Sequence, residues 1–134
     1  MKDRDGIKGI QRTAYAVSHF GNDLCASMWF TYGLYYIHYV QGLSDSQTGL
    51  VILCGQFADG IATTIVGVFS DKTNTRIGRR MPWYIFGTII VYPCFLGIFY
   101  DCFACKMFED DDHVTGTIYF CILAATFNVG WAAV

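Results

Sequence analysis

Two acidic residues stand inside long apolar stretches of the chain, and they are the first candidates for chemistry. Asp23 is the only carboxylate in residues 14–40, and Asp59 interrupts the apolar stretch at 48–69. A carboxylate at the middle of a membrane costs about 3 kcal/mol even on a lenient insertion scale. Such a group is tolerated where it faces a wet cavity, pairs with another group or takes up a proton. Both acids are therefore candidates for binding or ion coupling.

Polar neighbours of Asp23 lie at helical spacing from it. His19 is one turn earlier, Asn22 adjoins the acid and Ser27 is one turn later. Residues four apart share a helix face, so these side chains predict a polar stripe that lines a solute cavity. We assign substrate binding to His19, Asn22 and Asp23. The alternative is a structural hydrogen-bond cluster, because polar side chains also hold membrane helices together.

Oxygen-bearing side chains also surround Asp59. Gln56 precedes the acid by three residues and Thr63 follows it by four, so the three can share one face. Their oxygens could hold a hard cation such as Na⁺. Alternatively Asp59 could take up a proton, because burial favours the neutral form of a carboxylate. A purely structural interpretation is an acid paired with an arginine elsewhere in the protein.

A charged loop follows the second apolar stretch and carries the most specific pattern in the chain. It places one acid at a helix end, then a tight turn and three arginines. An ion pair between this acid and an arginine could latch the loop and break during a rocking motion. The residues assigned to this gating loop are Gly67, Asp71, Arg76, Gly78, Arg79 and Arg80. The alternative is a simple basic anchor on one side of a membrane.

Four apolar stretches must position these residues. A membrane-spanning helix needs about 20 mostly apolar residues, and each stretch reaches or nearly reaches this length. Backbone groups in lipid must be hydrogen-bonded within the protein, so the stretches are predicted to be helices. The predicted helices cover residues 14–40, 48–69, 82–100 and 117–134, after an N-terminal segment at 1–13. The sequence predicts an all-α membrane protein with about four transmembrane helices.

Composition and charge agree with a membrane protein. Hydrophobic residues make up 54% of the 134 positions and charged residues 15%, against about 25% charged in an ordinary soluble domain. A net charge of −2 gives no reason to expect a nucleic-acid partner. Eight of the nine basic residues lie before the first stretch or between the second and third. The positive-inside rule puts both groups, and the N-terminus, in the cytoplasm.

The six cysteines divide into two groups. Four lie inside apolar stretches and are interpreted as small hydrophobic residues, namely Cys25, Cys54, Cys94 and Cys121. Cys102 and Cys105 form a Cys-x-x-Cys pattern near His113. A lumenal disulfide, free thiols and a metal half-site all stay open for this pair. No nucleophile–base set or metal-ligand set is complete, so we predict no enzyme, no catalytic residue and no cofactor beyond a coupling H⁺ or Na⁺.

The charged loop and the first helix resemble a known family. The Gly-x-x-x-Asp-Lys pattern at 67–72, followed by Gly-Arg-Arg at 78–80, resembles the loop between helices two and three of the major facilitator superfamily. The longer pattern through Pro82-Trp83 resembles its glycoside–pentoside–hexuronide:cation symporter branch. The run at 19–23 resembles helix one of that branch. The resemblance covers nearly all of residues 13–134.

This resemblance implies a fold and residue roles. The four helices would belong to the N-terminal half of a transporter with about twelve spans that works by alternating access. In that branch the position of Asp23 contributes to substrate binding and the position of Asp59 to cation coupling. Sugar-transporting relatives carry a basic residue in place of Asn22 and a second carboxylate in place of Thr63. A sodium site with one carboxylate fewer would be weaker.

The resemblance also implies a solute and a location. The runs at 19–32 and 55–63 are most similar to an animal subgroup that is associated with cysteine import into lysosomes and melanosomes. Sugar:cation symport and a plasma-membrane location are the alternatives. The expected partners are a small-molecule solute, the lipid bilayer and the rest of a transporter chain. The competing interpretation is a four-span membrane scaffold or interaction protein without transport activity.

Overall fold

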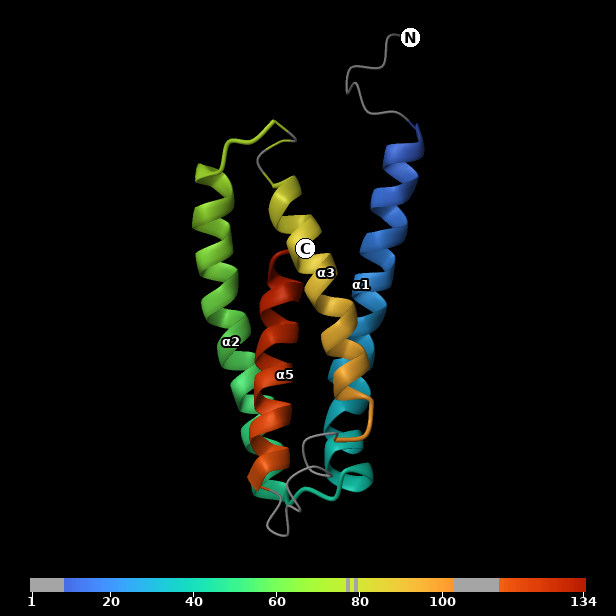
Figure 1. Cartoon of the computed structure of the whole chain (residues 1–134), viewed down its shortest axis with the longest axis vertical. Helices are drawn as coiled ribbons and strands as arrows, with labels where there is room; N and C mark the ends of the chain where they lie inside the picture. Colours follow the sequence, from blue (N-terminus) through green and yellow to red (C-terminus); the bar gives the residue numbers. More distant parts are fainter. Residues whose placement is uncertain (1–8, 77, 79, 103–113) are drawn as a thin grey trace.

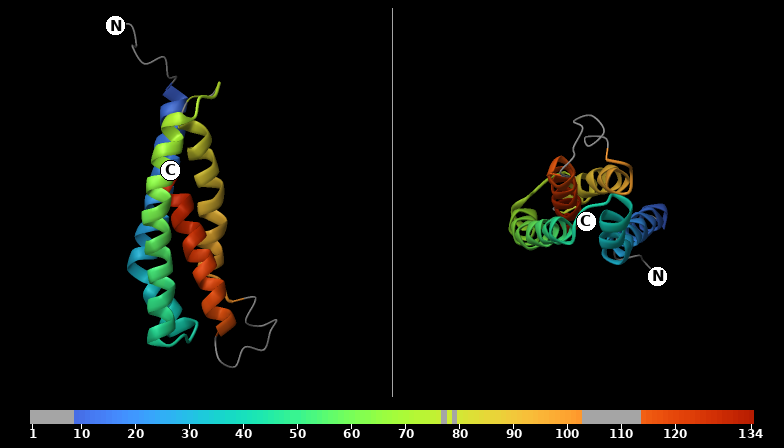
Figure 2. Two further views of the ribbon diagram at one scale, coloured as in Figure 1. Left: turned by 90° about the vertical axis from the view of Figure 1, so that its left-hand side faces the viewer. Right: turned by 90° about the horizontal axis from the view of Figure 1, so that it is seen from below.

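The chain forms an elongated bundle of helices (Figures 1 and 2). The computed structural model describes residues 9–76, 78, 80–102 and 114–134. In this part of the chain the helices are α1 (Gly9–Tyr35), the π-helical turn η1 (Tyr36–Val40), α2 (Asp45–Lys72), α3 (Met81–Ile98) and α5 (Val114–Ala132). No strand occurs among the described residues. The prediction of an all-α fold is confirmed.

Helix α5 forms the centre of the packing. It lies against α2 on one side and α3 on the other, while α1 packs mainly on α3 (Figure 1). Its side chains Phe120 and Phe127 are buried, and the ring of Phe127 contacts that of Trp29 on α1. A Cβ added to Gly87 on α3 would lie 2.5 Å from the carbonyl oxygen of Gly130. Small residues therefore let α3 and α5 approach closely, as is common between membrane helices.

Helices α1 and α2 extend beyond the apolar stretches that predict them, whereas α3 and α5 end at Ile98 and Ala132, two residues before the predicted ends at 100 and 134. Helix α1 begins at Gly9 rather than at residue 14, and α2 covers Asp45–Lys72 rather than 48–69. The added turns are polar, because helix ends outside an apolar layer can carry charged and capping residues. The π-helical turn η1 continues the first helix to Val40.

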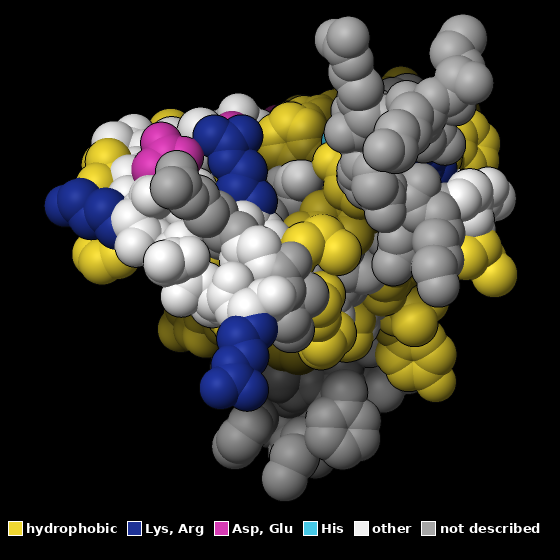
Figure 3. Space-filling view, turned by 90° about the horizontal axis from the view of Figure 1, so that it is seen from above, with side chains coloured by type: hydrophobic (Ala, Val, Ile, Leu, Met, Phe, Trp, Pro, Cys, Tyr) yellow, Lys and Arg dark blue, Asp and Glu magenta, His cyan; other side chains and the backbone are white. Residues whose placement is uncertain are grey.

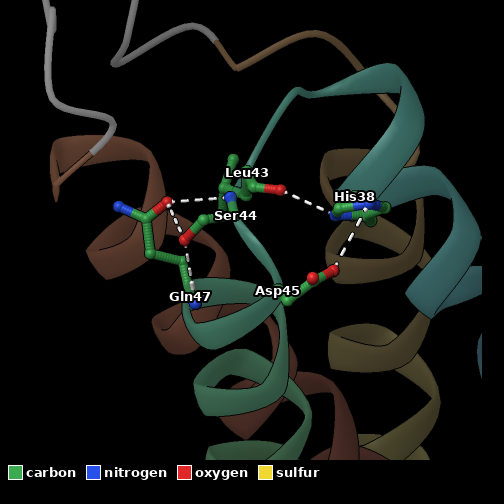
Figure 4. A network of polar contacts seen from close by, with 5 residues as sticks. All are labelled: His38, Leu43, Ser44, Asp45 and Gln47. Carbon is green, nitrogen blue, oxygen red and sulfur yellow. Dashed lines mark hydrogen bonds and ion pairs between the residues drawn. The ribbon is translucent and has the colours of Figure 1, made fainter.

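A polar network fixes the connection between α1 and α2. The Ser44 hydroxyl accepts a hydrogen bond from the Gln47 backbone N–H at 3.4 Å, and the Ser44 N–H donates to Gln47 Oε1 at 3.0 Å. This reciprocal pair is a capping box, which satisfies free N–H groups at the helix start. Beside it, His38 Nδ1 lies 2.8 Å from the Leu43 carbonyl oxygen (Figure 4). Its Nε2 lies 3.5 Å from Asp45 Oδ1, so the imidazole joins η1 to the first turn of α2.

Three helices are long and apolar enough to cross a membrane, namely α2, α3 and α5. Helix α1 does not reach the same mean hydropathy among the described residues, because it carries His19, Asn22 and Asp23. Large apolar side chains such as Phe20 and Leu24 nevertheless stay exposed along it. Such a surface suits contact with lipid or with further helices rather than with water. A fourth span at α1 stays a prediction.

Candidate functional site

The pair His19 and Asp23 lies on one exposed face of α1, as the spacing predicts. His19 Nε2 is 3.7 Å from Asp23 Oδ2, and the two side chains are 49% and 58% exposed. The ring of Tyr15 stacks on His19 one turn earlier, with centroids 6.1 Å apart. Tyr84 of α3 in turn stacks on Tyr15 at 4.9 Å and donates a hydrogen bond to its carbonyl oxygen at 3.3 Å. The acid and imidazole thus stand at the end of an aromatic contact between α1 and α3.

Asn22 points away from this pair. It is 4% exposed, and its Oδ1 has no hydrogen-bond partner among the described residues. With 3.6 residues per turn, neighbouring positions lie about 100° apart, so Asn22 and Asp23 cannot share a face. The three predicted substrate-binding residues therefore divide into an exposed histidine–aspartate contact and one buried amide.

Asp59 is half-buried on α2 and has one polar partner within the described chain. Thr63 Oγ1 donates a hydrogen bond to Asp59 Oδ1 at 3.3 Å. Gln56 is exposed, and its side chain makes no hydrogen bond with a described residue. One carboxylate and one hydroxyl are fewer oxygens than a hard cation takes in proteins. A cation site at Asp59 would therefore need further oxygen ligands from elsewhere.

The charged loop contains the predicted ion pair. Arg80 Nη2 lies 3.1 Å from Asp71 Oδ1, and the two side chains are 80% and 68% exposed. Figure 3 shows this end of the molecule, with acidic and basic side chains side by side. Arg76 is exposed and forms no ion pair with a described residue, and Arg79 lies outside the described residues. Of the three arginines, the structure assigns the contact to Arg80.

The turn in this loop explains the need for glycine at position 78. The Gly78 N–H donates to the Thr75 carbonyl oxygen at 3.1 Å, and Gly78 has φ +119°. Residues with a side chain rarely adopt this conformation. Beyond the turn, Trp83 Nε1–H donates to Thr73 Oγ1 at 3.0 Å. The turn and this bond hold the start of α3 against the end of α2.

A cavity of about 410 Å³ joins several of these residues. The hydroxyl-bearing residues Tyr15, Thr63, Ser70 and Tyr84 line it together with Arg80 and Gly67. It lies between α1, α2, α3 and the end of α5. Thr63, the hydrogen-bond partner of Asp59, therefore lines the same cavity as Gly67 and Arg80 of the gating loop. No ion pair or hydrogen bond joins Asp23 to Asp59 in the described part of the chain, and α1 and α2 contact each other little.

Comparison with known proteins decides the family. Residues 14–134 match the family described as MFS/sugar transport protein. The chain belongs to the major facilitator superfamily. The resemblance of its charged loop to that superfamily is thereby confirmed.

Curated relatives of this major facilitator chain are several times longer. It is 42% identical over 123 residues to major facilitator superfamily domain-containing protein 12 of Mus musculus, covering 91% of this chain and 25% of the relative. The human protein of that name is 40% identical over 127 residues, with 92% and 26% covered. An uncharacterized symporter of Synechocystis is 31% identical over 127 residues, with 92% and 22% covered. The chain spans about a quarter of the length of these relatives, and no solved structure matches it.

Asn128 is a buried polar residue of this major facilitator chain that sequence reasoning did not single out. Asn128 on α5 is fully buried, and its Nδ2 donates to the Ala124 carbonyl oxygen at 2.8 Å. Its Oδ1 has no partner among the described residues. A Cβ added to Gly55 on α2 would lie 2.8 Å from Asn128 Nδ2, so the amide packs on the glycine. Asn128 is the only amide side chain in the apolar stretch 117–134, and this pattern could have indicated a buried polar contact.

For Cys102, the first cysteine of the Cys-x-x-Cys pattern, the structure favours the disulfide among the three alternatives. Cys102 is buried and disulfide-bonded, so this sulfur is neither a free thiol nor a metal ligand. Cys105 and His113 lie outside the described residues. The cysteines Cys25, Cys54, Cys94 and Cys121 are free.

Proposed function

We propose that the chain contributes part of the N-terminal half of a secondary solute transporter that works by alternating access. The observation that carries the proposal is the half-buried Asp59, hydrogen-bonded to Thr63, inside α2, a helix apolar enough to span a membrane. An acid at that position is costly unless it has a use. Membership of the major facilitator superfamily supports the same mechanism.

The polar face of α1 is the proposed contact with the solute. His19 and Asp23 offer an imidazole and a carboxylate that are still half exposed in the described chain. A carboxylate attracts the ammonium group of an amino acid or accepts hydrogen bonds from sugar hydroxyls. The buried Asn22 is proposed to support this face from inside the bundle rather than to touch the solute first.

Asp59 is the proposed coupling residue, with Thr63 as its hydrogen-bond donor. A proton needs one basic oxygen, whereas Na⁺ needs several oxygens. Because Asp59 has one hydroxyl partner in the described chain, we propose a proton as the coupling ion. Gln56, on the same helix, would supply a further oxygen ligand if a cation is bound with the other half of the transporter.

The Asp71–Arg80 pair is the proposed latch on the cytoplasmic side. It connects the end of α2 to the start of α3, across the turn at Gly78. An exposed pair contributes about 0–1 kcal/mol, so it can break and re-form during a transport cycle. Arg76 is exposed and is proposed to take over the acid in another state.

Two solute classes are proposed for test. Cysteine import into lysosomes or melanosomes follows from the resemblance to the animal subgroup, and rice sucrose transport proteins, 36–40% identical over 50–55 residues, make sugar the second class. The experiment is uptake by sealed vesicles that contain the protein with this chain, comparing labelled cysteine with a panel of sugars under an imposed pH gradient. We expect saturable uptake of cysteine that collapses with the gradient. Uptake of none of these solutes above that of empty vesicles would contradict the proposal.

A four-span scaffold without transport activity remains the second candidate function. The predicted sidedness, with basic loops in the cytoplasm, fits a scaffold equally well. A scaffold has no need for Asp59 inside an apolar helix. If the protein is a scaffold, substitution of Asp59 should leave its binding to partner proteins and its amount in the membrane unchanged. The transport proposal accounts for the acid and is preferred.

A further inference from the structure

Two of the four free cysteines among the described residues line the same groove although the sequence separates them widely. Cys54 lies on α2 and Cys121 on α5, each in the first half of its helix. Helices α2 and α5 pack closely along their length. From the sequence alone, the four cysteines in apolar stretches are interpreted as separate small hydrophobic residues. The fold brings two of them, Cys54 and Cys121, to one groove.

The two cysteines open onto an apolar groove. A groove of about 670 Å³ is lined by Cys54, Cys121 and large apolar side chains that include Leu53, Phe57 and Ile122. These three side chains are exposed on the outside of the bundle. A lipophilic molecule in the membrane can therefore reach both sulfur atoms. The other two free cysteines, Cys25 and Cys94, do not line this groove.

The geometry points to Cys54 and Cys121 as a dithiol site for a soft, thiophilic centre, of which a lipophilic organoarsenic(III) oxide is the best-matched class. Sulfur ligands favour soft centres, and no cluster of three or more His, Cys, Asp or Glu residues occurs in the described chain. The site can thus supply two sulfur ligands and no further protein ligand.

The charge of the product selects this class. Two thiols condense with R–As=O to give R–As(SR)₂ and one water. Two As–S bonds form, the two thiol protons leave in the water, and no oxidant or reductant is required. The product is neutral, whereas a monovalent soft metal held by two thiolates would carry a net negative charge. An uncompensated charge is costly in an apolar groove, so the neutral adduct is favoured.

Binding by two sulfurs makes the site distinguishable from single thiols. The second As–S bond forms within the same complex, and such linkage raises apparent affinity by about 10²–10⁴-fold. The adduct also ties α2 to α5. The complete protein in membranes should therefore bind phenylarsine oxide with release by a dithiol such as 2,3-dimercaptopropanol, and not by the same thiol concentration of 2-mercaptoethanol.

The test counts protected thiols. The protein is treated with phenylarsine oxide, freed of excess reagent, denatured in detergent and labelled with a maleimide polymer that shifts its mass. We expect wild-type protein to lose two labelled thiols, and Cys54→Ser and Cys121→Ser to lose none at a reagent concentration that saturates wild type. Cys94→Ser is the matched control, and it should still lose two.

Variants that do not fold are replaced by Cys54→Ala and Cys121→Ala, with gel filtration as the check on folding. The inference is overturned if wild-type protein loses fewer than two thiols, or if protection survives in a folded Cys54 or Cys121 variant. It is also overturned if 2-mercaptoethanol reverses the protection as readily as the dithiol does.

Discussion

At the scale of single residues, the carboxylates of Asp23 and Asp59 differ in their surroundings. Asp23 is exposed beside an imidazole, whereas Asp59 is half-buried beside a hydroxyl. An exposed acid with a neighbouring imidazole can exchange partners with a solute, while a half-buried acid has few partners to exchange. This difference supports separate roles in binding and coupling.

Asn128 gives a prediction about packing at one glycine. Gly55→Ala would place a methyl group 2.8 Å from Asn128 Nδ2, so the amide or the helix must shift. We expect a loss of about 1–3 kcal/mol in stability, typical of overpacking. Thermal unfolding in detergent measures it. Gly60→Ala on the same helix is the control, because nothing lies within 4 Å of its added Cβ. Equal melting temperatures for the two variants would contradict this packing.

The cap of α2 gives a prediction with its own control. Ser44→Ala removes the hydroxyl that accepts the Gln47 N–H bond. Loss of an N-cap costs about 1 kcal/mol, so a small fall in melting temperature is expected. Ser46→Ala, inside the first turn of the same helix, should have a smaller effect. If Ser46→Ala destabilises the protein more than Ser44→Ala, the cap is assigned to the wrong serine.

At the scale of helices, the charged loop ties α2 to α3 through one exposed ion pair. Arg80→Ala should change thermal stability by less than about 1 kcal/mol, because exposed pairs contribute little. It should nevertheless shift the balance between inward-open and outward-open states, which labelling of engineered cysteines from each side measures. The double swap of Asp71→Arg with Arg80→Asp should restore the wild-type balance. Unchanged labelling in Arg80→Ala would exclude a latch at this pair.

Much of this helical arrangement could be predicted from the sequence, because apolar length and capping residues act locally. The stretch at 48–69 and Pro82 in the first turn of α3 both mark real helices. The π-helical turn at Tyr36–Val40 was not predictable, since its apolar residues suit an α-helix equally. Which arginine pairs with Asp71, and which way Asn22 points, depend on how the helices pack.

At the scale of the whole molecule, much apolar surface stays exposed on the described helices. Residues such as Phe20, Phe57 and Ile89 are exposed on α1, α2 and α3. In water this surface would cause aggregation, whereas lipid and further helices would cover it. We therefore expect the protein to leave cell membranes only with detergent. Recovery in a detergent-free buffer as a monodisperse species would contradict a membrane bundle.

The sidedness of the molecule can be measured on the same preparation. Basic residues such as Lys72 and Arg76 are predicted to lie in the cytoplasm. A cysteine introduced at Asn74, in the exposed loop after α2, should react with an impermeant maleimide only from the cytoplasmic side. One introduced at Ser46 should react only from the other side. Labelling of both from one side would rule out a spanning α2.

The most direct test of the central claim is coupled uptake by the Asp59→Asn variant, with Asp45→Asn on the same helix as the control. Asparagine keeps the size and polarity of the side chain but cannot take up a proton. In vesicles with an imposed pH gradient, we predict that Asp59→Asn loses gradient-driven accumulation of the solute, whereas Asp45→Asn keeps it. Gradient-driven accumulation that is the same in Asp59→Asn as in wild type would contradict the claim that Asp59 couples transport.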